Sequence, residues 1–115
     1  MTNKDNGDLE ISKALALAIG WPREDVIITA GQCLVDTHDL RNKVKVNSYW
    51  MHGCRVLDYK DWRVAGPVAE RHNCFPREID RQNGRWECVG PDGEWYYADT
   101  PQKAIALAVI QGTKK

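Results

Sequence analysis

The stretch that decides the fold is CFPREIDRQNGRWECVGPDGEWYYADTPQKAIALAVIQG, residues 74–112. Asn83-Gly84 is typical of a type I′ turn, which needs positive φ at both central residues, and Pro91-Asp92-Gly93 marks a second reversal of the chain. Strand-forming residues flank both turns. The stretch therefore predicts a three-stranded meander over residues 75–81, 85–89 and 94–98.

A helix is predicted directly after this meander. Thr100 suits its N-cap, and Pro101 suits the first helical position, where a backbone N–H is not needed. Apolar residues then recur at helical spacing as far as Gly112, and residues 113–115 are expected to form a C-terminal tail. The apolar positions are Ala104, Ile105, Ala108 and Val109.

An opening helix is predicted near the N-terminus. Asp8 suits its N-cap, Gly20 and Pro22 supply its end, and residues 1–7 are expected to form a flexible tail. The apolar residues that recur at helical spacing are Ile11, Ala14, Leu15, Ala18 and Ile19.

Two short strands follow this helix. Residues 26–29 are β-branched, and residues 32–35 continue beyond Ala30-Gly31, which suits a tight turn. Together with the meander they predict an α+β fold in which a small antiparallel sheet packs with three helices.

The segment DYKDWRVAGPVAERH, residues 58–72, predicts a short helix between the two halves. Pro67 fits the first helical position with Gly66 as the cap, and a longer version starts at Asp61 and bends at the proline. Trp62 is expected to anchor this helix on the sheet. The functional alternative is an anion held at the helix start near Arg63.

Residues 36–55 have a weaker pattern. Val44 and Val46 alternate with basic residues and predict a strand, whereas residues 47–54 show no period. Arg41, Lys43 and Lys45 would share one strand face, either as a solvated edge that discourages aggregation or as a local basic patch.

The composition indicates one soluble domain spanning residues 1–115. Hydrophobic residues make up 43% and charged residues 28%, and no run of 18 apolar residues could cross a bilayer. The first ten residues, MTNKDNGDLE, do not resemble a signal peptide, so a cytoplasmic protein is expected. Lys plus Arg and Asp plus Glu number 16 each, which disfavours general nucleic-acid binding.

The cysteines raise the question of a metal site or a nucleophile. His52-Gly-Cys54 and His72-Asn-Cys74 form two H-x-C pairs, and four such ligands would suit zinc. Their spacing is not that of a zinc knuckle, and the simpler interpretation is that Cys33, Cys74 and Cys88 are buried thiols. Glycine-rich phosphate loops and G-x-S-x-G are absent, so we expect neither a cofactor nor catalysis.

The aromatic residues are the remaining functional signal. Core packing is expected to take Trp21, Trp62, Trp86 and one face of the last strand, so other rings must be exposed. Exposed Trp, Tyr and Arg are enriched at protein interfaces. The partner-binding residues predicted on this basis are Arg41, Lys43, Lys45, Tyr49, Trp50, Arg55 and Tyr96.

Three motifs resemble those of small accessory proteins of tailed phages and prophages, namely the NinX-like proteins and the phage ABA-sandwich domain. They are ALALAIGW (residues 14–21), DW-x-x-x-GP-V-x-ER (residues 61–71) and TPQKAIALAVI (residues 100–110). The resemblance covers residues 11–110 and implies an α/β/α layered domain of phage origin, without catalytic residues to transfer. The chain departs from the family pattern in residues 36–57.

The sequence thus predicts a non-enzymatic phage or prophage accessory protein in the host cytoplasm that binds a host protein or complex, such as a defence complex. The alternatives are a small-ligand or metal-binding module that uses His52, Cys54, His72 and Cys74, and a nucleic-acid-binding accessory protein. A homodimer is a further alternative, because an exposed strand edge or aromatic patch can pair two copies.

Overall fold

The computed structural model describes residues 3–36, 50–51 and 54–114, and the side chains of residues 7–35 and 56–114. These residues form three α-helices and two antiparallel sheets, which confirms the predicted α+β class. The elements in chain order are α1 (Asn3–Ala18), the 3₁₀ turn η1 (Arg23–Asp25), β1 (Val26–Thr29), β2 (Gln32–Asp36), β3 (Trp50–Met51), β4 (Cys54–Val56), α2 (Trp62–His72), β5 (Pro76–Asp80), β6 (Arg85–Val89), β7 (Trp95–Ala98) and α3 (Pro101–Gly112).

The N-terminal sheet has the strand order β1-β2-β4-β3. Its β1–β2 hairpin turns through Ala30 and Gly31, whose φ angles of 51° and 73° are both positive, as a two-residue primed turn requires. The predicted tight turn is therefore confirmed. On the far side of β2, the amide of Leu57 donates to the carbonyl of Cys33 at 2.8 Å and continues the ladder.

The C-terminal sheet is the predicted meander, in the order β5-β6-β7, and it is separate from the N-terminal sheet. The turn between β5 and β6 differs from the prediction, because Gly84 has a positive φ of 61° and Asn83 does not. The carboxylate of Asp80 accepts hydrogen bonds from the backbone and the side-chain amide of Asn83, at 3.2 and 2.6 Å. This Asx-type turn supplies a reversal that a type I′ turn would otherwise make.

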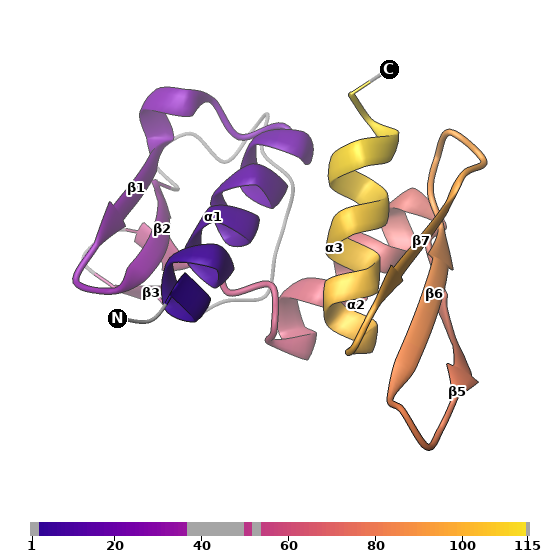
Figure 1. Ribbon diagram of the computed structural model, residues 1–115. Helices are drawn as coiled ribbons and strands as arrows, with labels where there is room; N and C mark the ends of the chain where they lie inside the picture. Colours follow the sequence, from indigo (N-terminus) through magenta and orange to yellow (C-terminus); the bar gives the residue numbers. More distant parts are fainter. Residues whose placement is uncertain (1–2, 37–49, 52–53, 115) are drawn as a thin grey trace.

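The helices lie between the two sheets (Figure 1). Helix α1 packs on β1 and β2, and α3 lies between α1 and the strands β5–β7. The α/β/α order implied by the family resemblance is not seen in the described part of the chain. As predicted, Thr100 caps α3, with its hydroxyl accepting a hydrogen bond from the amide of Lys103 at 3.2 Å.

Helix α2 follows the longer of the two predicted versions. Asp61 is its N-cap and accepts from the amide of Arg63 at 2.9 Å, so Gly66 and Pro67 lie inside the helix. The expectation that Gly66 caps it is wrong, because the buried stripe already starts at Val64, before the proline. The prediction that Trp62 anchors the helix is also wrong, because its side chain is 51% exposed.

Helix α1 starts earlier than predicted. It begins at Asn3, so Asp8 lies within the helix rather than at its N-cap, and residues 3–7 are not a loose tail. Asp8 instead accepts a hydrogen bond from the hydroxyl of Tyr59 at 2.7 Å, and Ser12 accepts one from the amide of Tyr59 at 3.1 Å. These two contacts fasten the segment before α2 to α1.

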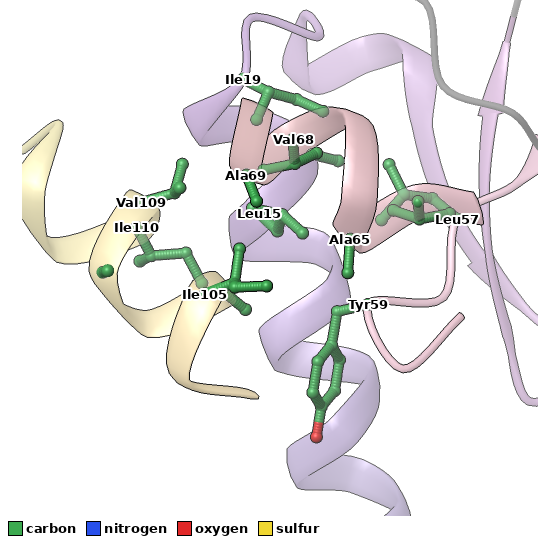
Figure 2. Packing of buried hydrophobic residues seen from close by; sticks show 14 of the residues in the cluster. Leu15, Ile19, Leu57, Tyr59, Ala65, Val68, Ala69, Ile105, Val109 and Ile110 are labelled. Carbon is green, nitrogen blue, oxygen red and sulfur yellow. The ribbon is translucent and has the colours of Figure 1, made fainter. Parts of the chain in front are cut away.

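The core is centred where the three helices meet. Leu15 of α1 lies between Val68 and Ala69 of α2 and Ile105 of α3, all almost fully buried (Figure 2). The ring of Tyr59 extends from this cluster along α1, and its hydroxyl points away from the cluster (Figure 2). In the residues that the structure describes, no helix is long and apolar enough to span a membrane.

Replacement of Gly90 by Ala is expected to destabilise the protein by about 1–3 kcal/mol. The added Cβ would lie 2.8 Å from Cε2 of Tyr96 and 2.9 Å from the carbonyl oxygen of Ala108, so the meander and α3 would have to separate. Urea unfolding followed by circular dichroism measures this loss. The matched control is Gly7→Ala in α1, where nothing lies within 4 Å of the new Cβ and stability should not fall.

Candidate functional site

The structure describes the predicted partner-binding residues only in part. Arg41, Lys43, Lys45 and Tyr49 lie outside the described residues. The backbones of Trp50 and Arg55 are described, and the β3–β4 register places these two residues opposite each other. Their pairing brings two predicted interface residues side by side, Trp50 on the edge strand β3 and Arg55 on the adjacent strand β4.

Tyr96 lies on the inner side of the C-terminal sheet. It is half-buried against the core, and its register partner is the fully buried Cys88. Its hydroxyl donates to Asp92 at 2.7 Å, and this hydrogen bond, followed by burial, raises the pKa of Tyr96 to about 12. The structure therefore assigns Tyr96 to packing. Sequence reasoning expected this ring on the surface, but it is the one ring of β7 that points toward the core.

The exposed rings of β7 are Trp95 and Tyr97, which are 50% and 49% exposed. They share the face opposite Tyr96, because successive residues of a strand point to opposite sides. Phe75, just before β5, is 57% exposed. Extending the β5–β6 register by one residue places it opposite Val89, whose partner on β7 is Trp95.

An ion pair lies among these rings. Arg77 of β5 is opposite Glu87 of β6, which is opposite Tyr97 of β7. The guanidinium of Arg77 donates from Nε to Glu87 at 2.9 Å and also from Nη2, and it lies 5.8 Å from the centre of the Trp95 ring. Glu87 is only 7% exposed although it lies on the outer side of the sheet.

We call this surface the aromatic face, defined as Phe75, Arg77, Glu87, Trp95 and Tyr97. The Arg77–Glu87 pair compensates the buried carboxylate and holds the guanidinium against Trp95, so the rings and the ion pair form one preorganised surface. The sequence contained its signal in the shared face of Trp95 and Tyr97. The expectation that Tyr96 is exposed implies the opposite orientation of β7, because nothing local distinguishes which side of a strand a helix will cover.

Two hollows flank the side chain of Asp8, at about 350 and 440 Å³. Both are also lined by Lys60, whose ammonium lies 3.2 Å from the Asp8 carboxylate. The hydrogen bond from Tyr59 and the nearby Lys60 hold the pKa of Asp8 below its usual value, against the effect of burial. Ser12, which also lines the smaller hollow, accepts a hydrogen bond from the Tyr59 amide, so its hydroxyl has a structural role there.

The H-x-C residues do not form a described ligand set. His52 lies outside the described residues, and for Cys54 only the backbone is described. The thiol of Cys74 donates to the carbonyl of His72 at 3.3 Å. Among the residues that the structure describes, no group of three or more His, Cys, Asp or Glu side chains could hold a metal ion.

The described thiols are buried and free, as predicted for Cys33, Cys74 and Cys88. Burial raises the pKa of Cys33 to about 11 and that of Cys88 to about 12, and it also raises the pKa of Cys74. Since the thiolate is the reactive form, these three residues are poor nucleophiles at neutral pH.

Comparisons of this chain with protein-family models, curated proteins and solved structures find no significant match. What the aromatic face can bind is therefore inferred from its own geometry and charge.

The protein should lose stability between about pH 7 and pH 5 through His72. Burial, and secondly Arg71, lower the pKa of His72 below 6.5, and its Nε2 is buried without a hydrogen-bond partner among the described residues. The unfolded chain therefore binds the proton more readily, so stability is fully present above the unfolded pKa and declines as pH falls toward the folded pKa. Urea unfolding at both pH values should show a smaller decline for His72→Gln than for the wild type. An equal decline in both proteins would contradict this assignment.

Iodoacetamide should leave Cys33, Cys74 and Cys88 unmodified in the native protein at pH 7.5, because all three are buried and carry raised pKa values. Peptide mass spectrometry identifies the modified positions, and the same labelling in urea is the control in which these cysteines must react. Rapid native labelling of any of the three would argue against their purely structural role.

Proposed function

We propose that this protein is a phage- or prophage-encoded, non-catalytic accessory protein that binds a host protein through the aromatic face. The observation that carries this proposal is the exposure of Phe75, Trp95 and Tyr97 on one side of a three-stranded sheet. Large aromatic side chains dominate the binding energy of protein interfaces, and neighbouring rings on a sheet need little reorganisation to dock.

The charge of the aromatic face favours a protein partner over nucleic acid. Its one cation, Arg77, is paired with Glu87, and the chain as a whole has a formal net charge of zero. Nucleic-acid binding draws on unpaired positive charge that neutralises phosphates. The combination of Trp, Tyr and Arg without excess charge is instead typical of protein–protein interfaces.

The phage context comes from the resemblance of residues 11–110 to the NinX-like proteins and the phage ABA-sandwich domain. In that context the host cytoplasm is the proposed compartment, and blocking a host defence complex is the concrete form of the proposed activity. The buried, raised-pKa thiols of Cys33, Cys74 and Cys88 make these three described residues poor candidates for a nucleophile, which is consistent with a binding role.

Trp95→Ala should weaken capture of the host partner by about thirtyfold, because loss of a central aromatic anchor costs about 2 kcal/mol or more. Tagged protein is incubated with host-cell lysate, the retained protein is identified by mass spectrometry, and its affinity is then measured with the purified partner. Trp62→Ala is the matched control, since Trp62 is also half exposed, at 51%, but lies on α2.

The proposal holds if one host protein or complex is retained by the wild type and by Trp62→Ala but not by Trp95→Ala. Equal loss in both tryptophan variants, or retention by all three proteins, would place the binding surface elsewhere. Circular dichroism of each variant confirms that the fold is intact before affinities are compared.

A further inference from the structure

The guanidinium of Arg77 is the charge that the aromatic face presents to a partner. The side chain of Arg77 is 72% exposed, whereas the side chain of its ion-pair partner Glu87 is only 9% exposed. The two formal charges are equal and opposite, but their exposure is not. A molecule that docks on the aromatic face therefore meets the cation and not the carboxylate.

Glu87 occupies only one edge of this guanidinium. The hydrogen bonds from Nε and Nη2 of Arg77 both go to a single oxygen, Oε2 of Glu87. A guanidinium has five N–H donors, arranged in forks that match a carboxylate. The donors of Nη1 and the second donor of Nη2 have no acceptor among the residues that the structure describes. These donors form a second, open fork.

The open fork lies among apolar rings. The guanidinium carbon of Arg77 is 5.8 Å from the centre of the Trp95 ring, and the register places Tyr97 in the same row of the sheet as Arg77 and Glu87. Trp95 and Tyr97 are both about half exposed. Apolar atoms that flank an acceptor can therefore pack on these rings while the acceptor meets the guanidinium.

The shape of the fork favours a carboxylate as the acceptor. A carboxylate has two oxygens that can accept two parallel N–H bonds, and such charge-assisted bonds are about twice as strong as bonds between neutral groups. A backbone carbonyl of a partner has a single oxygen and no charge. A nucleic acid presents a succession of phosphates, whereas the aromatic face has one cation.

We propose that the aromatic face binds an acidic side chain of the partner protein, an aspartate or a glutamate with an apolar residue beside it. The carboxylate accepts hydrogen bonds from Nη1 and Nη2 of Arg77, and the apolar neighbour packs on Trp95. This inference rests on the proposed function and adds the chemistry of the partner. Because Glu87 and Trp95 already hold the guanidinium, binding costs little of its side-chain entropy.

Peptide selection followed by calorimetry tests this chemistry. A phage-displayed library of random peptides is selected on the immobilised wild-type protein, and the enriched peptides should share an Asp or Glu within two positions of an apolar residue. The most enriched peptide is then synthesised in its acidic form and with Asn or Gln in place of the acid. Isothermal titration calorimetry should show about tenfold or more weaker binding of the neutral form.

Two variants assign this difference to Arg77. The Arg77→Gln/Glu87→Gln double variant removes the cation without leaving a buried carboxylate uncompensated, and it should bind the acidic and neutral peptides equally. The matched control is Arg81→Gln, which removes an arginine that directly follows β5, is 91% exposed and pairs with Glu78. This control should discriminate between the peptides as the wild type does. Circular dichroism confirms that both variants are folded.

Selection that enriches no acidic peptide, or equal affinity of the wild type for the two peptide forms, would overturn this inference. So would a double variant that still prefers the acidic peptide. These outcomes are distinct from failure of the proposed function. A host protein that requires Trp95 but is bound equally by the wild type and the double variant would leave the proposed function intact, whereas its retention by Trp95→Ala would contradict the proposed function itself.

Discussion

The burial of α3 is the constraint on which the rest of the structure depends. Five of its residues have an exposed fraction of 1% or less, namely Ala104, Ile105, Ala106, Ala108 and Val109. Small side chains let this helix contact α1 and α2 on one side and the meander on the other. At its end, Gly112 lies against the ring of Pro91, so even the last turn is closely packed.

This packing explains which parts of the fold could be predicted from the sequence. The elements with local signals are the Ala30-Gly31 hairpin, the meander and the Thr100-Pro101 helix start, and they form because their turn and cap residues act within a few positions. Only the conformation of the Asn83-Gly84 turn differs from the prediction. The start of α1 was predicted wrongly because Asp8, a typical cap residue, is used in a contact with Tyr59 that spans 51 positions. Local patterns do not contain such a contact.

In the aromatic face, too, some features follow from local sequence and others depend on the fold. Alternation along β7 correctly places Trp95 and Tyr97 together and Tyr96 apart. Which of these two sides becomes the surface is decided by α3, which covers the Cys88 side of the sheet and leaves the Glu87 side open. The Arg77–Glu87 pair was likewise beyond sequence reasoning, because it depends on the β5–β6 register and on a bulge near Glu78.

The two sheets lie on opposite sides of the helices, so β1 and the aromatic face are at opposite ends of the molecule (Figure 1). The helices stand between the two, because α1 packs on β1 and β2 and α3 packs on the meander. A partner that docks on the aromatic face would therefore leave the N-terminal sheet uncovered.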